Sequence, residues 1–283
     1  MCNLPQGTHP FLSVSNTGME SAELERGLQA WREAVMADPR ARWDAAHDLP
    51  YWAQVAGRYE AARAPLPRTV DALRSRLEPH WSLLDVGAGT GRFTRPLADA
   101  VRHVTALDYS PAMLQVLRQH LPPNVTPRLG RFQDPNLPGH DAVLCAWALY
   151  RSPDLRADVA ALWRLARQTL FVLEDNGTSA PHLAWRRGTA RLPWPRTRLI
   201  AGVLREWTPD VEVLDIGETR VQEFANEAEF LAFARVDAVQ GPAFLAAMAP
   251  HVTRTGVGLR YEYSSVVTLV TARRPSRPTT RTA

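Results

Sequence analysis

The sequence predicts an α/β fold built on a mostly parallel, doubly wound sheet, because apolar runs typical of buried strands alternate with stretches of helical periodicity. One observation is a glycine-rich turn, Gly87–Gly91, that follows the apolar run Leu83–Val86 and precedes a helix-compatible segment. A second is a β-branched, apolar run that ends at Asp108, about 20 residues after the turn. Ligands of such sheets bind outside the carboxyl ends of the strands, where both features stand.

The composition is that of a soluble globular protein. Hydrophobic residues make up 45% and charged residues 22% of the 283-residue chain, which are ordinary values. No apolar run approaches the ~20 residues that span a bilayer, and the N-terminus lacks the pattern of a secretory signal peptide. The two cysteines, Cys2 and Cys145, provide neither a disulfide framework nor a metal cluster. We therefore expect a cytoplasmic protein that does not interact with membranes, with Cys145 as a buried structural thiol.

The net charge of +4 comes from arginine, since the sequence contains no lysine. A basic protein can bind nucleic acid when its charge is clustered. Here the arginines are scattered among acidic residues and are concentrated only between Arg186 and Arg198 and in the C-terminal tail. The charge pattern therefore does not favour a nucleic-acid partner.

The spacing of the glycines separates two kinds of nucleotide site. A dinucleotide fingerprint requires G-x-G-x-x-G, whereas Arg92 stands where its third glycine would be. The pattern D-x-G-x-G-x-G from Asp85 to Gly91 resembles motif I of the class I S-adenosylmethionine-dependent methyltransferases. The resemblance is close over residues 50–175 and loose elsewhere. It implies a seven-stranded, mostly parallel sheet with one antiparallel strand, S-adenosyl-L-methionine as cofactor, and methyl transfer to a small-molecule acceptor.

Three further segments carry the resemblance, at 104–113, 125–134 and 141–150. By the resemblance, Asp108 binds the ribose, Tyr109 and Met113 lie near the adenine, and Asp134 with Gln133 reads the adenine edge. Tyr51 and Tyr59 are candidates for an aromatic contact from the helical region that precedes the core. The cofactor-binding residues expected on this basis are Asp85, Gly87, Ala88, Gly89, Gly91, Asp108, Tyr109, Met113, Gln133, Asp134, Ala146 and Tyr59.

Three of these residues also have a purely structural explanation. A carboxylate at the position of Asp108 can cap the following helix, which Ser110-Pro111 is expected to begin. An aspartate before proline, as at Asp134, is a common turn residue. Tyr59 can be an ordinary core anchor of an amphipathic helix.

The domain organisation follows from periodicity and turn residues. Leu24, Leu28, Trp31 and Val35 recur at helical spacing, and a second helical stretch extends from 50 to 63. Alternating patterns predict strands at 211–224 and 259–271, with helices at 226–234 and 244–251 between them. The expected boundaries are a flexible arm at 1–18, a methyltransferase domain at 19–272 and a disordered tail at 273–283. Within the domain we expect a helical cap at 19–66, a cofactor-binding core at 67–175, a substrate-side insertion after the fifth strand at 176–210, and closing strands and helices at 211–272.

No catalytic residue can be assigned from the sequence. Tyr150, Glu174 and His182 stand in segments near the expected site, but their spacing is not diagnostic. Asp175-Asn176 is similar to the metal-binding pair of catechol-type methyltransferases, yet Ala146-Trp147 replaces the aspartate those enzymes need on the preceding strand. We therefore expect no metal.

Several alternatives to a small-molecule methyltransferase remain open at this stage. They are a nucleic-acid or protein methyltransferase, an NAD(P)-dependent oxidoreductase, and a protein that binds S-adenosylmethionine without transferring its methyl group. The acceptor atom (O, N, C or S) and the oligomeric state also remain open.

Overall fold

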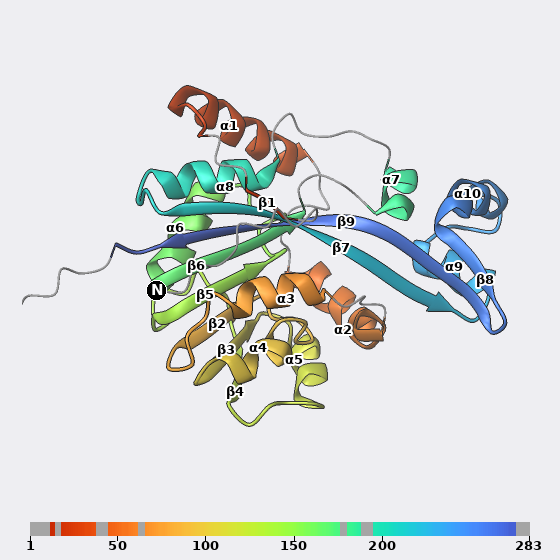
Figure 1. The fold of residues 1–283 in the computed structure, drawn as a ribbon, viewed down its shortest axis with the longest axis horizontal. Coiled ribbons are helices and arrows are strands. Elements are labelled where there is room, and N and C mark those ends of the chain that lie inside the picture. Colours follow the sequence, from red (N-terminus) through yellow and green to blue (C-terminus); the bar gives the residue numbers. More distant parts are fainter. Residues whose placement is uncertain are drawn as a thin grey trace, which may run out of the picture.

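The computed structural model describes residues 12–14, 18–37, 45–61, 66–175, 180–187 and 195–275. A nine-stranded sheet crosses this part of the chain in the order β1-β7-β9-β6-β5-β2-β3-β4, and β8 pairs with β9 (Figure 1). The strands are β1 (Leu12–Val14), β2 (Ser82–Val86), β3 (His103–Asp108), β4 (Val125–Leu129), β5 (His140–Ala146), β6 (Ala166–Asp175), β7 (Val211–Phe224), β8 (Val252–Thr255) and β9 (Gly258–Arg273).

Helices connect most of these strands. They are α1 (Ser21–Ala37), α2 (Ala45–Ala61), α3 (Pro67–Arg74), α4 (Thr94–Leu97), α5 (Pro111–Arg118), α6 (Leu155–Leu165), α7 (Pro181–Arg187), α8 (Arg196–Arg205), α9 (Glu227–Ala234) and α10 (Gly241–Met248). Two short 3-10 helices, η1 (Ala98–Ala100) and η2 (Ala249–His251), follow α4 and α10.

The strand directions confirm the predicted sheet. Strands β4, β3, β2, β5 and β6 pair in parallel. Strand β9 is antiparallel to both β6 and β7, so β7 points the same way as the first five. These seven strands form the expected mostly parallel sheet with one antiparallel member. The chain builds β2, β3 and β4 outward in one direction and then returns to place β5 beside β2, which creates the switch point where doubly wound folds bind ligands.

Helices cover both faces of this sheet. Figure 1 shows α1, α6 and α8 on one face and α3, α4 and α5 on the other. Successive strand residues point to opposite faces, so in β2 Leu84 packs into the core beneath the first set of helices and Leu83 into the core beneath the second. Both side chains are fully buried. A sheet covered in this way is fixed in register, and the strand ends hold the loops between them in place.

Strands β7 and β9 extend beyond the sheet and carry a small distal lobe at their far ends (Figure 1). The lobe consists of α9, α10, η2 and β8, which pack around a separate aromatic core. Its fully buried rings are those of Phe230, Phe244 and Tyr261. The alternating pattern had predicted both long strands, and Asn226 caps α9 by accepting a hydrogen bond from the Glu229 N–H at 2.9 Å.

Two features differ from the secondary structure predicted for the N-terminal region. Helix α2 begins at Ala45, so Pro50 lies inside it, a position at which proline usually ends a helix. A tertiary contact holds this first turn, because the buried Asp48 accepts a hydrogen bond from Arg151 Nη1 at 2.6 Å. Strand β1 lies in the segment expected to be a loose arm, since three residues are too few for a periodicity to show.

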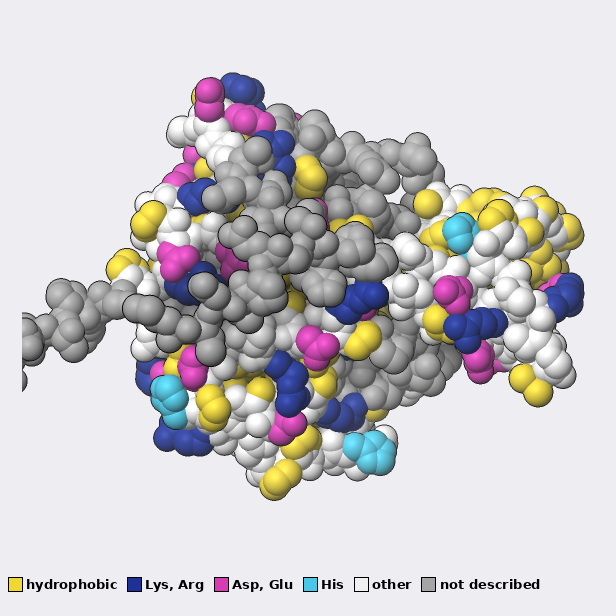
Figure 2. Space-filling view, viewed as in Figure 1, with side chains coloured by type: hydrophobic (Ala, Val, Ile, Leu, Met, Phe, Trp, Pro, Cys, Tyr) yellow, Lys and Arg dark blue, Asp and Glu magenta, His cyan; other side chains and the backbone are white. Residues whose placement is uncertain are grey.

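The surface of the described residues mixes charges of both signs. Figure 2 shows arginines next to aspartates and glutamates over the face in view, rather than a continuous basic stripe. In the ranges that the structure describes, no helix combines the length and apolarity needed to cross a membrane. Cys145 is fully buried, and burial raises the pKa of its thiol well above the usual value, as expected of an unreactive structural cysteine.

Candidate functional site

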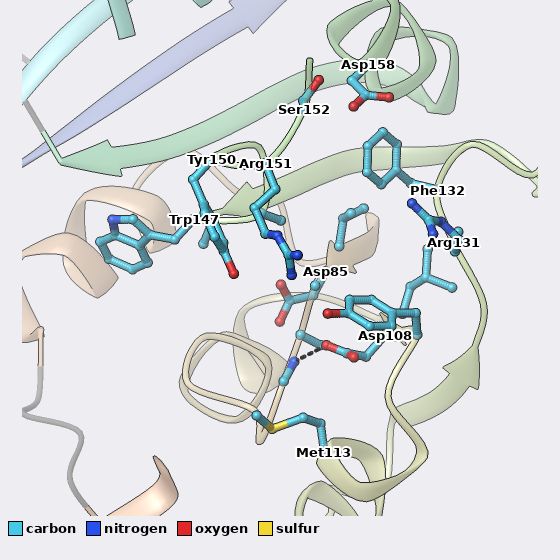
Figure 3. A pocket seen from close by; sticks show the side chains of 18 of the residues that line it. Asp85, Asp108, Met113, Arg131, Phe132, Trp147, Tyr150, Arg151, Ser152 and Asp158 are labelled. Carbon is cyan, nitrogen blue, oxygen red and sulfur yellow. Dashed lines mark hydrogen bonds between the residues drawn. The ribbon is translucent and has the colours of Figure 1, made fainter. Parts of the chain in front are cut away.

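A cavity of roughly 1610 Å³ opens at the carboxyl ends of the parallel strands (Figure 3). It brings together residues from the glycine turn, from the ends of β3 and β5, from the loop after β4 and from α2. Ten of the twelve predicted cofactor residues line it: Asp85, Gly87, Ala88, Gly89, Asp108, Tyr109, Met113, Gln133, Ala146 and Tyr59. Gly91 and Asp134 lie outside its lining.

The three glycines of the turn have different structural roles. All have positive φ, at +69° for Gly87, +55° for Gly89 and +93° for Gly91, a region that disfavours other residues. A Cβ on Gly91 would stand 2.5 Å from Leu117 Cδ1, so this glycine allows the turn to pack on α5. A Cβ on Gly89 would meet only the Gly87 carbonyl oxygen, at 3.9 Å, because it would project into the cavity. Gly89 therefore leaves its backbone accessible to a ligand.

Asp108 joins the end of β3 to this turn. Its Oδ2 accepts a hydrogen bond from the Gly89 N–H at 2.8 Å, the contact drawn in Figure 3, and its Oδ1 accepts one from the Ser110 N–H at 2.8 Å. The side chain is 7% exposed. Burial raises the pKa of the carboxyl group, while the two backbone donors act in the opposite direction. Each oxygen has further lone pairs for donors in the cavity.

Asp85 fixes the base of the turn. Its carboxylate is 2% exposed and accepts a hydrogen bond from Thr94 Oγ1, with 2.5 Å between the two oxygens. This contact joins the end of β2 to the first residue of α4. Asp85, the first residue of the glycine motif, therefore makes a structural hydrogen bond and also lines the cavity.

The loop after β4 lines the end of the cavity opposite Trp147. Figure 3 shows Arg131 and Phe132 of this loop there, with Asp158 of α6 beside them. Gln133 lines this end and donates a hydrogen bond from Nε2 to Asp158 Oδ1 at 3.0 Å. Asp134 instead accepts a hydrogen bond from the Asn136 N–H at 2.9 Å, as a turn residue does.

Helix α2 closes over the part of the cavity that Tyr109 lines. Trp52 and Tyr59 project from it into the lining, and Trp52 Nε1 donates a hydrogen bond to the Tyr109 hydroxyl at 2.6 Å. Burial raises the pKa of Tyr109 to about 12. Tyr51 points to a different neighbour, because its hydroxyl accepts a hydrogen bond from Arg235 Nη2 at 2.8 Å. The helix is thus joined to both the β3 loop and the distal lobe.

The far end of the cavity contains residues that the sequence did not single out as site residues. Trp147 follows β5 with a positive φ of 50°, an uncommon conformation for tryptophan. Its ring stacks on Phe93 with 5.8 Å between centroids, and the Arg92 guanidinium lies 5.7 Å from its centroid. Asp175, the last residue of β6, lines the same end. A signal was present for both positions, since ligands of such sheets bind at the carboxyl ends of the strands, where β5 and β6 end.

The three residues considered as possible bases lie in different environments. Tyr150 lines the cavity and is 42% exposed. Glu174 is fully buried and paired with Arg196 Nη2 at 2.5 Å. His182, on α7, is buried against the aromatic core of the distal lobe, where its Nδ1 lies 3.1 Å from the Tyr261 hydroxyl. Neither Glu174 nor His182 lines the cavity. In the described ranges no cluster of three or more His, Cys, Asp or Glu side chains is arranged to hold a metal ion.

Comparison with known proteins points to one family. Residues 83–169 match the model of a methyltransferase domain. A malonyl-[acyl-carrier protein] O-methyltransferase from Serratia marcescens is 36% identical over 121 residues, which make up 41% of this chain and 47% of that protein. A magnesium-protoporphyrin O-methyltransferase from Rhodobacter capsulatus is 31% identical over 106 residues, with 32% and 47% covered. The matches thus span about half the length of these curated relatives.

Solved structures share the fold. A putative methyltransferase of an antibiotic biosynthesis pathway from Anabaena variabilis superposes with a TM-score of 0.51 at 19% identity, over 75% of this chain and 99% of that one. A putative methyltransferase from Bacillus halodurans gives a TM-score of 0.50 at 15% identity, over 74% and 98%. The domain match and the strand order show a methyltransferase domain with the class I methyltransferase fold. The glycine turn resembles motif I of the S-adenosylmethionine-dependent members of that class, and S-adenosyl-L-methionine is the cofactor that this resemblance indicates.

Proposed function

We propose that this protein transfers the methyl group of S-adenosylmethionine to a small-molecule acceptor. One observation carries the proposal: the buried Asp108 carboxylate and the open Gly89 backbone are hydrogen-bonded to each other and face the same cavity. A nucleoside requires a carboxylate that can accept both ribose hydroxyls and a backbone without side chains beside it. The residues present fit that requirement.

The chain's own groups would bind and orient the cofactor. Asp108 would accept hydrogen bonds from the ribose, with Tyr109 and Met113 beside the base. The segment that contains Ala146 would face the amino-acid part, since it adjoins the glycine turn: a Cβ on Gly87 would stand 2.9 Å from Ala148 Cβ. S-adenosylmethionine, when bound, supplies a methyl group already activated on a sulfonium. The remaining tasks of the protein are alignment and exclusion of water, and α2 provides the cover.

Oxygen is the acceptor atom that the comparisons favour. Both curated relatives are named O-methyltransferases, although each aligns over only 47% of its length. The cavity is large enough for a cofactor and a second molecule, since ligand pockets of about 300–1,000 Å³ already hold one drug-sized ligand. The cavity volume supports a small molecule as the acceptor, and the two names support oxygen as the first atom to test, although the acceptor of the first relative is attached to a carrier protein.

The alternatives are less well supported. The mixed charges on the visible face give no footprint for nucleic acid (Figure 2). A dinucleotide would need the third glycine that Arg92 replaces. A protein that binds the cofactor without transferring its methyl group would share every feature of the cofactor-binding half of the cavity, so only an assay of methyl transfer separates it from an enzyme.

Calorimetric titration with S-adenosylmethionine, its demethylated product and NAD tests the cofactor directly. We expect micromolar binding of the two sulfur compounds and no binding of NAD. Binding of NAD alone would support an oxidoreductase. A screen of hydroxyl-bearing small molecules with methyl-labelled cofactor then tests transfer, and binding without any transfer in that screen would favour the non-catalytic alternative.

Replacing Asp108 should weaken cofactor binding. We expect Asp108→Ala to lose about 1.5–3 kcal/mol of binding free energy, the range for hydrogen bonds to a charged group. The thermal unfolding of the variant, measured in parallel, shows whether its fold is retained. Wild-type affinity in a folded variant would contradict the assignment of Asp108 to the ribose.

The raised pKa of Asp108 predicts the pH dependence of the same binding reaction. The ribose hydroxyls donate to the ionised carboxylate, so affinity should be complete above that pKa and should fall as the pH drops through it. Asp108→Asn should bind more weakly and show a flatter pH profile. Titration of both proteins over the acidic pH range checks the prediction, and identical slopes would assign the dependence to another group.

A further inference from the structure

The cavity extends past the cofactor-binding half to the carboxyl end of β6, where Asp175 lines it. Asp175 stands three strands from Asp108 in the sheet, which is about 14 Å at the usual strand spacing. The Asp175 side chain is 50% exposed. Its ion pair with Arg220 is long, with 4.0 Å between Oδ1 and Nη2, whereas a hydrogen bond is shorter. This ion pair therefore leaves acceptor lone pairs of the carboxylate available to a ligand in the cavity.

A buried indole N–H lies beside this carboxylate. The Nε1 of Trp147 makes no hydrogen bond of ordinary geometry to the residues that the structure describes. The same N–H faces Asp175 and lowers the pKa of its carboxyl group as a weak hydrogen-bond donor. Trp147 therefore helps to hold the Asp175 carboxylate in place and leaves most of its lone pairs available to a ligand.

Trp147 is also held rigidly. Its positive φ of 50° costs backbone energy, and such conformations cluster at functional sites. Its ring is fixed between Phe93, stacked at 5.8 Å and 24°, and the Arg92 guanidinium. The strained backbone and these two neighbours therefore fix the Trp147 ring as a wall of the cavity beside Asp175.

We propose that Trp147 and Asp175 form the acceptor subsite and that this subsite takes an uncharged hydroxyl group, with Asp175 as the base. The proposal rests on the proposed function and specifies its acceptor. A hydroxyl has one donor, which it can direct to the half-exposed Asp175 carboxylate, while the Trp147 indole N–H holds that carboxylate from the protein side. The aromatic wall of Trp147 and Phe93 suits an acceptor with an apolar body.

The reaction at this subsite balances in atoms and charge. The acceptor oxygen forms a bond to the methyl carbon, the bond from that carbon to the sulfonium breaks, and the sulfur keeps the electron pair as a neutral thioether. The hydroxyl proton passes to the Asp175 carboxylate, which becomes a neutral acid. One positive charge on sulfur and one negative charge on the carboxylate are thus removed together, and no other reagent is needed.

The groups around Asp175 influence its titration in both directions. Burial raises the pKa of its carboxyl group, and the positive charges nearby, Arg220 above all, act to lower it. The charged and titratable groups that face it from neighbouring elements are Arg220 on β7, Arg196 on α8, Arg92 after the glycine turn, Tyr263 on β9 and Glu174 on its own strand. A carboxyl group with a raised pKa is a better proton acceptor than an ordinary one.

Two defined probes test the placement of Asp175 without knowledge of the acceptor. The demethylated product of the cofactor has a neutral thioether at the position of the sulfonium, and sinefungin has a primary ammonium group on carbon there. If Asp175 faces the transferred methyl, the ammonium will donate to its carboxylate. Calorimetry should show that Asp175→Asn loses about 10- to 100-fold in affinity for sinefungin and less than about twofold for the thioether. For the wild type, the ratio of the affinity for sinefungin to the affinity for the thioether should fall as the pH drops through the Asp175 pKa.

Asp158→Asn is the matched control, because it removes the same charge from the opposite end of the cavity (Figure 3). It should leave the ratio of the two affinities unchanged. If both probes bind and Asp175→Asn also keeps the wild-type ratio, the subsite is wrong while the proposed function stands. If neither probe binds to the folded wild type, the cofactor assignment fails and the subsite falls with it. Thermal unfolding of each variant confirms that the comparison is between folded proteins.

Discussion

Gly89→Val is expected to abolish S-adenosylmethionine binding while the protein still folds. The new side chain would project into the cavity, since only the Gly87 carbonyl oxygen lies within 4 Å of a Cβ at this position. It would therefore displace the ligand and not another part of the protein. The positive φ of 55° adds a conformational cost of about 2 kcal/mol to the folded state. Calorimetric titration combined with thermal unfolding separates the two effects.

Gly91→Ala provides the opposite control two residues away. Its Cβ would stand 2.5 Å from Leu117 Cδ1, a fully buried side chain of α5, so the substitution should lower the melting temperature. It adds no atom to the cavity lining. We expect its folded fraction to keep more affinity for the cofactor than Gly89→Val does. If Gly89→Val bound S-adenosylmethionine as the wild type does, the cofactor would not lie against this turn.

The same contrast shows what the sequence could and could not predict about the turn. The alternation of glycines after Asp85 predicted a close backbone approach, and the structure places Gly87 and Gly89 in the cavity lining. The sequence could not show that Gly91 serves packing, because its neighbour Leu117 is 26 residues away and meets it only through the fold. A local sequence pattern predicts local backbone geometry, but it does not predict contacts between residues that are distant in the sequence.

The strand ends were predictable for a similar reason. Periodicity placed the ends of β3 and β5, and parallel strands bring their carboxyl ends to one edge, so Asp108 and Ala146 meet in one cavity. The loop after β4 was harder to predict, since Asp134 and Gln133 are both polar and only the turn geometry decides which one faces the cavity. Trp147 was missed as a site residue because its importance depends on a positive φ that tryptophan rarely adopts.

The pairing of Glu174 with Arg196 was also beyond the sequence. On the sequence alone, Glu174 is a possible base and Asp175 is only part of a metal-like pair. The two neighbours point to opposite faces of β6. Glu174 is fully buried and Asp175 is half exposed in the cavity. A carboxylate buried next to a functional one must be compensated, and Arg196 supplies the compensation from α8.

Removing this compensation should have the largest effect on stability. Arg196→Met keeps much of the side-chain volume but leaves Glu174 buried without the guanidinium, whose Nη2 lies 2.5 Å from its Oε2. It also removes the cation that lies 4.9 Å from the ring centroid of Trp31. Breaking a buried ion pair on one side costs about 3–5 kcal/mol. Denaturant unfolding of the variant at neutral pH should show a loss of this size.

The matched double variant Glu174→Leu/Arg196→Met should recover most of that loss, because apolar side chains of similar volume often replace a buried ion pair without net cost. The pH dependence tests the cause. Burial already raises the pKa of Glu174, and loss of Arg196 should raise it further, so the deficit of Arg196→Met should be greatest above that pKa and shrink as the pH falls through it. A deficit that stayed well below about 3 kcal/mol and did not change from about pH 8 to about pH 5 would mean that Glu174 is neutral in both proteins, and that the pair is a hydrogen bond rather than an ion pair. A constant deficit of the full size would mean that Glu174 stays ionised in both.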